Sequence, residues 1–278
     1  MEGGIIWLAS YPKSGNTWMR ALLSNYNSNS DKPVSINELD TDGIASSRGR
    51  FDEFVGVDSS EMTFDEIDNL RPDVYEHIAQ ETRKRLYIKA HDAYTYLPDG
   101  RGLIPNDNSK FIYIVRNPLD IVPSLSNHSG KSIESTVDFI CDQRSCFSKG
   151  KRGFNLQLRQ KLLTWASHVK SYIYNEELEL IVIRYEDMQQ DINSTFKRVL
   201  EFCELEIDEE RLKKAIEFSD FKILQKQEQQ EGFKERSPSS DKFFFSGKVG
   251  TGKDKLTPEQ IEKIIAVNGS VMRELGYI

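Results

Sequence analysis

A loop of eight residues between an apolar run and a helix-like stretch constrains this chain more than any other feature. The loop occupies residues 11–18, the apolar run residues 5–9 and the helix-like stretch residues 19–26. This order predicts a strand, a turn and a helix. A helix begins with unpaired backbone N–H groups and the positive end of its dipole, so an anion bound there is stabilised by groups already in place. The loop therefore predicts an anionic ligand.

The loop differs from that of nucleoside triphosphatases, which reads G-x-x-x-x-G-K-[ST]. When the two are aligned, Gly15 is the second glycine and Thr17 is the hydroxyl residue, but Asn16 replaces the lysine and Ser10 replaces the first glycine. The positive charge lies instead at Lys13, in the middle of the turn, where its side chain can lean over the ligand.

The sequence of the loop, Y-P-K-S-G-N-T-W, resembles that of the sulfotransferases that use 3′-phosphoadenosine 5′-phosphosulfate (PAPS). Their 5′-phosphosulfate loop reads Y-P-K-[SA]-G-T-T-W, so the departure within it is Asn16. The resemblance implies that the loop binds the donor through Lys13, Ser14, Gly15, Asn16, Thr17 and Trp18.

Charge and composition exclude several other classes of protein. The chain of 278 residues has a formal net charge of −7, which argues against a general binder of nucleic acid or of anionic membranes. Its apolar runs are far shorter than the ~20 residues of a membrane span, and the first strand begins without the basic region and apolar core of a signal peptide. We therefore expect a cytoplasmic protein. Its three cysteines lack a metal-ligand spacing, so we expect them to be reduced.

Apolar runs alternate with amphipathic stretches along the chain, which predicts a mostly parallel sheet flanked by helices. The predicted strands are 5–9, 86–89, 111–115 and 179–184. The predicted helices are 17–26, 118–128, 133–147, 156–175, 194–203, 209–218 and one that begins at Pro258. We expect a single α/β domain over residues 1–278, and the resemblance implies the three-layer sandwich of P-loop nucleoside triphosphate hydrolases.

Two polar, turn-rich stretches interrupt this pattern, at residues 29–71 and 226–245. Long irregular segments in a compact domain are often lids or binding loops. We expect them to cover the acceptor site, although a solvated surface linker remains an alternative for 225–231.

The strand at 86–89 leads to Lys89 and then His91, at the sheet edge where ligands of open α/β sheets bind. Imidazole titrates near neutral pH and can take a proton from an attacking hydroxyl. The family resembled has K-T-H here, which implies that His91 is the base and that Lys89 lies near the transferred group. The other histidines lie in helix-like stretches, where packing is the simpler explanation: His77, His128 and His168.

The strand at 111–115 ends in Arg116, where a nucleoside triphosphatase usually has an acidic residue for magnesium. A planar guanidinium binds phosphate bidentately, so this end calls for an anion and no metal. The resemblance to R-N-P-x-D-x-x-x-S assigns Arg116 and Ser124 to the 3′-phosphate of the nucleotide. Asp120 is more simply an acidic residue in the first turn of a helix.

Adenine recognition requires flat apolar faces and a polar edge. The resemblance places the base between Trp18 and Phe221 and brings Tyr185, in a Y-E-D-M stretch, to its amino group. A glycine-rich stretch at 245–257 resembles R-K-G-x-x-G-D-W-K-x-x-x-T, which implies donor contacts from Ser246, Gly247 and Lys248. Phe245 and Ser246 stand where the family has Arg and Lys on the 3′-phosphate.

The expected activity is in-line transfer of the sulfuryl group from PAPS to a hydroxyl group of a small molecule, which leaves adenosine 3′,5′-bisphosphate (PAP). Lys13 would stabilise the charge that grows on the bridging oxygen, His91 would deprotonate the acceptor, and Lys89 would hold the sulfuryl group. The resemblance further implies that Ser124 holds Lys13 back until the acceptor binds. The kind of acceptor and the oligomeric state are left open.

Two other functions remain as alternatives. A metal-dependent P-loop kinase shares the strand–loop–helix start, but it should have the lysine that Asn16 replaces and an acidic residue for magnesium. A nucleotide-binding module without catalysis is favoured by Phe245 and Ser246, and is disfavoured by the combination of Lys13, Lys89 and His91.

Overall fold

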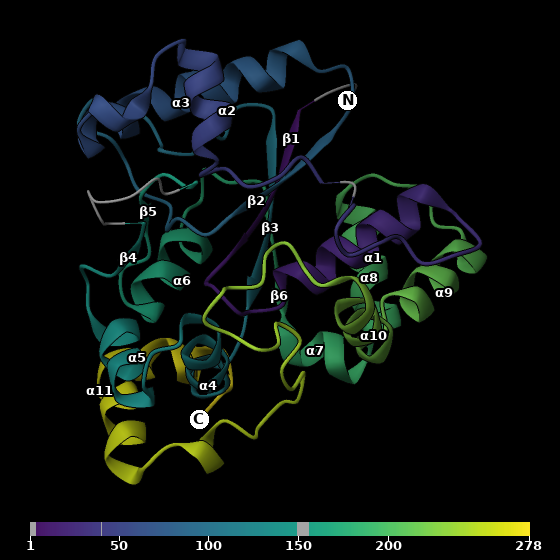
Figure 1. Cartoon of the computed structure of the whole chain (residues 1–278), viewed down its shortest axis with the longest axis vertical. Coiled ribbons are helices and arrows are strands. Elements are labelled where there is room, and N and C mark those ends of the chain that lie inside the picture. Colours follow the sequence, from purple (N-terminus) through teal and green to yellow (C-terminus); the bar gives the residue numbers. More distant parts are fainter. Residues whose placement is uncertain (1–3, 40, 149–155) are drawn as a thin grey trace.

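The protein was analysed as a computed structural model that describes residues 4–39, 41–148 and 156–278. Four strands form a parallel sheet in the order β2-β1-β3-β6 (Figure 1). They are β1 (Ile5–Ser10), β2 (Leu86–Ala90), β3 (Ser109–Val115) and β6 (Leu180–Arg184). The four predicted strands and the α/β fold are therefore confirmed. A separate antiparallel pair joins β4 (Cys146–Phe147) to β5 (Gln160–Lys161).

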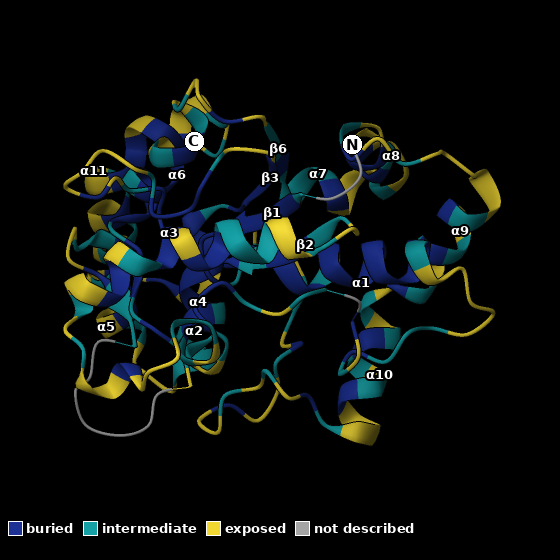
Figure 2. Ribbon diagram, turned by 90° about the horizontal axis from the view of Figure 1, so that it is seen from above, coloured by how far each residue is buried: buried dark blue, intermediate teal, exposed yellow. Residues whose placement is uncertain are grey.

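Helices cover both faces of the sheet because β1 and β3 are apolar on both. Trp7 and Phe111 face one layer of helices, whereas Leu8 and Ile112 face the other. The first layer contains α3 (Phe64–Glu81), α4 (Pro118–Ser129), α5 (Ile133–Cys141), α6 (Trp165–Ile173) and α11 (Pro258–Glu274). The second contains α1 (Asn16–Ser28), α7 (Tyr185–Gln190), α8 (Ile192–Phe202) and α9 (Glu209–Phe218). The result is a three-layer sandwich in which the strands are buried between helices (Figure 2).

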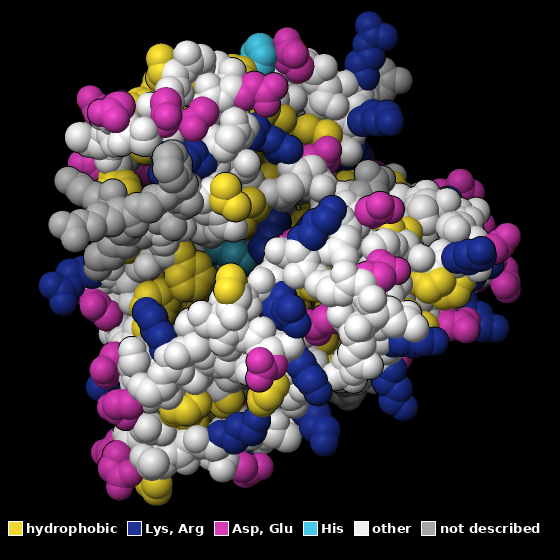
Figure 3. Space-filling view, viewed as in Figure 1, with side chains coloured by type: hydrophobic (Ala, Val, Ile, Leu, Met, Phe, Trp, Pro, Cys, Tyr) yellow, Lys and Arg dark blue, Asp and Glu magenta, His cyan; other side chains and the backbone are white. Residues whose placement is uncertain are grey.

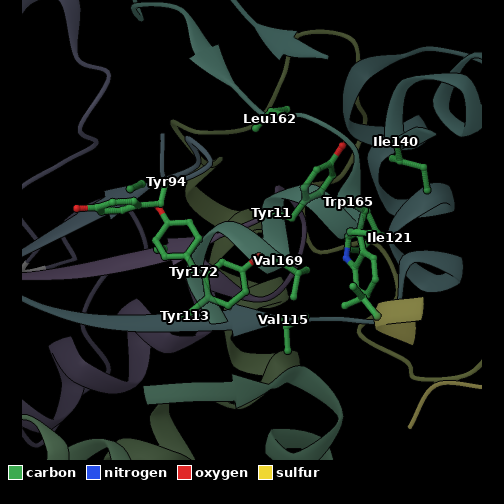
Figure 4. Close-up of a cluster of buried hydrophobic side chains, with 14 of the residues drawn as sticks. Tyr11, Tyr94, Tyr113, Val115, Ile121, Ile140, Leu162, Trp165, Val169 and Tyr172 are labelled. Atoms are coloured by element: carbon green, nitrogen blue, oxygen red, sulfur yellow. The ribbon is translucent and has the colours of Figure 1, made fainter. Parts of the chain in front are cut away.

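Aromatic rings fill the core between β3 and α6 (Figure 4). Tyr113 and Tyr172 stack with ring centroids 4.6 Å apart, and both are fully buried. Trp165 and Val169 continue this apolar face of α6 toward α4 and α11. The core therefore ties the middle strand to the layer of helices that contains α6.

Two helix predictions were too long. The helix that begins at Ile133 ends at Cys141, and α6 begins at Trp165 because Thr164 caps it and Leu163 has a φ of 60°. Between these helices, Cys146–Phe147 pairs instead with Gln160–Lys161 as β4 and β5. Periodicity alone could not separate a short buried strand from a helical turn.

The two stretches expected to be irregular contain helices. In 29–71 the chain forms α2 (Arg48–Val55), a 3₁₀ turn η1 (Ser59–Glu61) and the start of α3, while residue 40 lies outside the described residues. A capping box between Thr63 and Glu66 begins α3, and this start signal was overlooked. In 226–245, α10 (Phe221–Glu231) extends through residue 231. None of the helices in the described part of the chain is both long enough and apolar enough to span a bilayer.

Candidate active site

The loops that follow the four parallel strands meet at one edge of the sheet and surround a cavity of about 470 Å³. Figure 3 shows it as a hollow that contains a histidine and a Lys or Arg side chain, with hydrophobic side chains along one wall. Fourteen of the fifteen sequence-predicted site residues line the cavity, and Ser14 does not: the fourteen are Lys13, Gly15, Asn16, Thr17, Trp18, Lys89, His91, Arg116, Ser124, Tyr185, Phe221, Ser246, Gly247 and Lys248.

The loop after β1 leaves the start of α1 open to the cavity. Gly15, the residue before the helix, has a φ of 105°, and no side chain caps the first turn. A Cβ at Gly15 would lie 2.6 Å from the Tyr185 ring, so the close approach of this ring requires glycine. The uncapped N–H groups and the helix dipole together form a site for an anion.

Asn16 supports the loop from within, whereas Ser14 is buried beneath it. The Asn16 side-chain amide donates to the Leu8 carbonyl at 2.7 Å and to the Ser10 hydroxyl at 3.2 Å. Any contact of Asn16 with a ligand therefore depends on its backbone N–H. Ser14 is fully buried and does not line the cavity, and its hydroxyl has no hydrogen-bond partner among the described residues, so its expected part in donor binding stays a prediction.

Lys13 lies within the turn, with a φ of 69° and its Nζ 3.6 Å from the centroid of the Phe243 ring. Burial, reinforced by the positive charges of Lys89 and Arg116, lowers the pKa of Lys13 to about 7. The ammonium group thus rests on an aromatic face beside the open helix start. The expectation that Ser124 holds Lys13 back until the acceptor binds stays a prediction.

Lys89 and Arg20 share a carboxylate that the sequence analysis did not single out. Glu235 accepts a hydrogen bond from Lys89 Nζ at 2.8 Å and pairs with Arg20 through its other oxygen. Burial alone would raise the pKa of Glu235, but the two cations hold it well below its usual range. The segment after α10 is therefore fastened to the end of β2.

His91 has a defined tautomer. Its Nδ1 lies 2.8 Å from the Ser10 carbonyl oxygen, which can only accept, so Nδ1 carries the proton and Nε2 keeps its lone pair. Burial, with the nearby charge of Lys89, lowers the pKa of His91 well below its ordinary value. This histidine is neutral at pH 7 and suited to accept a proton.

A buried chain of hydrogen bonds positions the backbone of His91. His168 Nε2 donates to the His91 carbonyl at 3.0 Å, and the Tyr113 hydroxyl donates to His168 Nδ1 at 2.8 Å. Burial lowers the pKa of His168 to about 4, so this ring is neutral as well. The expectation that His168 is a packed histidine agrees with its complete burial.

Asp92, the residue after His91, anchors the same loop to α3. Both of its carboxylate oxygens accept from the Arg71 guanidinium, at 3.1 and 2.8 Å, and both residues are fully buried. Arg71 also donates to the Tyr75 hydroxyl at 2.9 Å. The end of β2 is thus held by a charge-assisted bidentate pair.

Arg116 and Tyr185 connect the loops of different strands. The Arg116 guanidinium lies 4.3 Å from the Tyr185 ring centroid and donates to the carbonyl oxygens of Lys13 and Lys248. The Tyr185 hydroxyl donates to the Gly247 carbonyl at 2.9 Å. Arg116 Nε is buried without a partner among the described residues, which leaves a donor for a ligand.

Asp120 does more than oppose the helix dipole. Its carboxylate accepts from the backbone N–H groups of Gly250 and Gly252, at 2.8 and 2.6 Å. Gly247 lies so close to the Phe221 ring that a Cβ would come within 2.8 Å of it. The glycine-rich stretch is therefore fixed against both α4 and α10.

Four further cavity-lining residues were missed as site residues: His128, Glu235, Phe243 and Lys255. For Glu235 and Phe243 the available signal was their position in 226–245, the stretch that was expected to cover the acceptor site. His128 had been interpreted as a packed or surface histidine. It lines the cavity instead, where burial and the charges of Lys13 and Lys89 lower its pKa to about 4.

In the described part of the chain, no group of three or more His, Cys, Asp or Glu side chains is placed to hold a metal ion. The three cysteines are free thiols.

Comparison with known proteins places this site in a family. The profile of the sulfotransferase domain matches residues 5–276. Cytosolic sulfotransferase 16 of Arabidopsis thaliana is 26% identical over 283 residues, which cover 98% of this chain and 77% of that protein. Luciferin sulfotransferase of Photinus pyralis is also 26% identical, over 93% of this chain and 69% of that protein.

Solved structures show the same fold. Mouse sulfotransferase SULT7A1, complexed with PAP, aligns with a TM-score of 0.63 and 18% identity over 97% of this chain and 85% of that one. Retinol dehydratase, in a complex with retinol and PAP, aligns with a TM-score of 0.64 and 16% identity over 98% of this chain and 82% of that one. With a domain match that spans nearly the whole chain, this protein belongs to the sulfotransferase family.

Proposed function

We propose that this protein transfers the sulfuryl group of PAPS to a hydroxyl group of a small molecule and releases PAP. The observation that carries the proposal is the meeting of Lys13, Lys89 and His91 in one cavity beside the uncapped start of α1. An anion site, two cations and a neutral base are the groups that this reaction needs. The names of relatives described as cytosolic support a cytoplasmic location.

The proposed chemistry follows from the protonation states. His91, neutral and with Nε2 free to accept, would remove the acceptor proton as its oxygen attacks sulfur. Lys13 would stabilise the negative charge that grows on the oxygen between phosphorus and sulfur. Lys89 would hold the sulfuryl oxygens, and its bond to Glu235 would weaken as it does so.

The binding of the nucleotide would use the rest of the cavity. Arg116 and Ser124 would hold the 3′-phosphate, and Trp18 and Phe221 would contact adenine, since all four line the same space. The hydroxyl of Tyr185 is engaged by Gly247 and Gln189, so its expected contact with adenine would require sharing that hydroxyl.

A small, partly apolar acceptor fits the remaining space. Ile44, Phe147 and Phe243 line the cavity together with Lys89 and His91. Apolar walls with few polar groups are usual for sites of small molecules. The relatives named for luciferin and for flavonol support this class of acceptor.

Calorimetric titration of PAP, without metal, tests the donor site. We expect binding to the wild type and a clear loss of affinity in Lys13→Ala, with ATP plus magnesium as the control ligand. Transfer of labelled sulfate from PAPS to a panel of phenols and alcohols then tests the reaction, and Lys13→Ala should lower kcat by about 10²–10³-fold. Binding of ATP with magnesium and none of PAP would instead favour a kinase.

A further inference from the structure

The glycine-rich stretch lacks the two cationic side chains that the family has for the 3′-phosphate, because Phe245 and Ser246 stand in their places. Backbone N–H groups could substitute for them in a phosphate nest. In this protein, however, the N–H groups of Gly250 and Gly252 both donate to Asp120. These two N–H groups are therefore not free for a phosphate, which turns attention to the cationic side chains of the same cavity.

Lys255 is a cation at the right place. It lines the cavity together with Ser124, Arg116 and Ser246, and its Nζ lies 4.5 Å from the centroid of the Phe245 ring. A ring face attracts an ammonium group and leaves its hydrogens free for another acceptor. Phe245 thus supports Lys255 at the position where an arginine is absent.

The backbone beneath Lys255 is fixed close to the start of α4. Lys255 N donates to the Gly252 carbonyl at 3.0 Å within the 3₁₀ turn η2 (Lys253–Lys255). A Cβ at Gly252 would lie 2.1 Å from the Leu119 carbonyl oxygen, so this turn packs directly on α4. Ser124 lies on the same helix, and Arg116 directly precedes its cap.

From this arrangement we infer that Lys255, supported by Phe245, binds the 3′-phosphate of the nucleotide beside Arg116 and Ser124. The inference rests on the proposed function, since it concerns a nucleoside 3′,5′-bisphosphate in the same cavity. In this arrangement Phe245 supports the cation that binds the 3′-phosphate. Its presence in place of an arginine therefore does not mean that the cationic site has been lost.

The chain offers a matched control in Lys253. It belongs to the same 3₁₀ turn and carries the same charge, but it is not among the residues that line the cavity. Lys253→Met and Lys255→Met therefore change net charge equally, and they keep an apolar stem of similar length. A difference in ligand affinity between the two variants therefore results from where the lost charge was located and not from the change in net charge.

The experiment is calorimetric titration of PAP and of adenosine 5′-monophosphate into the wild type and both variants. We expect Lys255→Met to weaken PAP binding by about 10- to 100-fold, the effect of one lost charge-assisted hydrogen bond. Binding of the monophosphate, which has no 3′-phosphate, should stay within about twofold, and Lys253→Met should leave both ligands unaffected. Near-ultraviolet circular dichroism verifies that each variant is folded.

A rescue variant distinguishes the loss of the Lys255 charge from a disturbance of the turn caused by the substitution. Adding Phe245→Arg and Ser246→Lys to Lys255→Met should restore PAP binding, because it returns cations to the same phosphate. Equal losses for PAP and the monophosphate, or equal losses in the two single variants, would overturn the inference while the proposed function stands. A wild type that binds PAP no better than the monophosphate would overturn the 3′-phosphate site itself and, with it, the proposed donor.

Discussion

The proposed mechanism needs opposite protonation states at two residues of the cavity. Burial lowers the pKa of His91 well below its ordinary value and the pKa of Lys13 to about 7. The histidine must be neutral to act as a base, whereas the lysine must be charged to stabilise an oxyanion. Both conditions hold in the free protein only between these two pKa values.

The pH dependence of kcat/KM for the donor tests this at Lys13. We expect kcat/KM to fall as pH rises through about 7, because the free protein then loses the Lys13 proton. The alkaline limb of kcat should lie higher, since the bound anion raises the pKa of Lys13. Lys13→Arg, which stays charged, should remove the limb near 7 even if its rate is lower; the same limb in this variant would contradict the assignment.

The charge of Glu235 should also affect the pH at which Lys13 loses its proton. Burial and the charges of Lys89 and Arg116 lower the pKa of Lys13, whereas Glu228 and Glu235 raise it. Glu235→Gln removes one of the opposing charges, so the alkaline limb of kcat/KM should move to lower pH. Glu231→Gln, at an exposed position at the end of α10, is the matched control and should leave the limb in place.

At the scale of elements, β2 and α3 are joined by the buried pair of Arg71 and Asp92. Arg71→Met leaves the Asp92 carboxylate buried without its partner, so we expect the free energy of unfolding to fall by about 3–5 kcal/mol. Urea denaturation measures this loss. Arg101→Met breaks a largely exposed ion pair with Asp73 and should cost much less. Similar losses in the two variants would show that burial is not the cause.

The pair of Arg71 and Asp92 also positions the loop that contains His91, the proposed base. Asp92 directly follows His91, and Tyr172 on α6 donates to the Asp92 carbonyl at 2.8 Å. Helices of the layer that contains α3 and α6 therefore fix the end of β2 from two sides. A loop held in this way keeps the proposed base, His91, in a fixed position.

At the scale of the whole molecule, stability should decline in mild acid. Burial lowers the pKa of His168 to about 4, whereas the unfolded chain binds a proton there below about 6.5. Between these values the unfolded state binds more protons, so the free energy of unfolding decreases as pH falls. The full effect is on the order of 3 kcal/mol.

Urea denaturation at a series of pH values from 7.5 to about 4.5 measures this slope. His168→Gln has a lower stability at pH 7 because it disturbs the bonds to Tyr113 and His91. Its stability should nevertheless change less with pH than that of the wild type. An unchanged slope would show that His168 is not the group that titrates.

The sequence by itself determined the order of the elements along the chain and which residues follow the carboxyl ends of the strands. Four apolar runs became four parallel strands, and because the carboxyl ends of such strands meet at one edge, Lys13, His91 and Arg116 were predicted to lie there, while the family resemblance added Tyr185. Only the tertiary structure decided the partners of these residues. Phe243 lies on Lys13, Glu235 on Lys89 and Phe245 under Lys255, and all three contacts join segments distant in the chain or irregular in backbone. Such contacts have no period, because they depend on how α10 packs against α1 and how the turn before α11 packs on α4, and periodicity reports only which side of an element is buried.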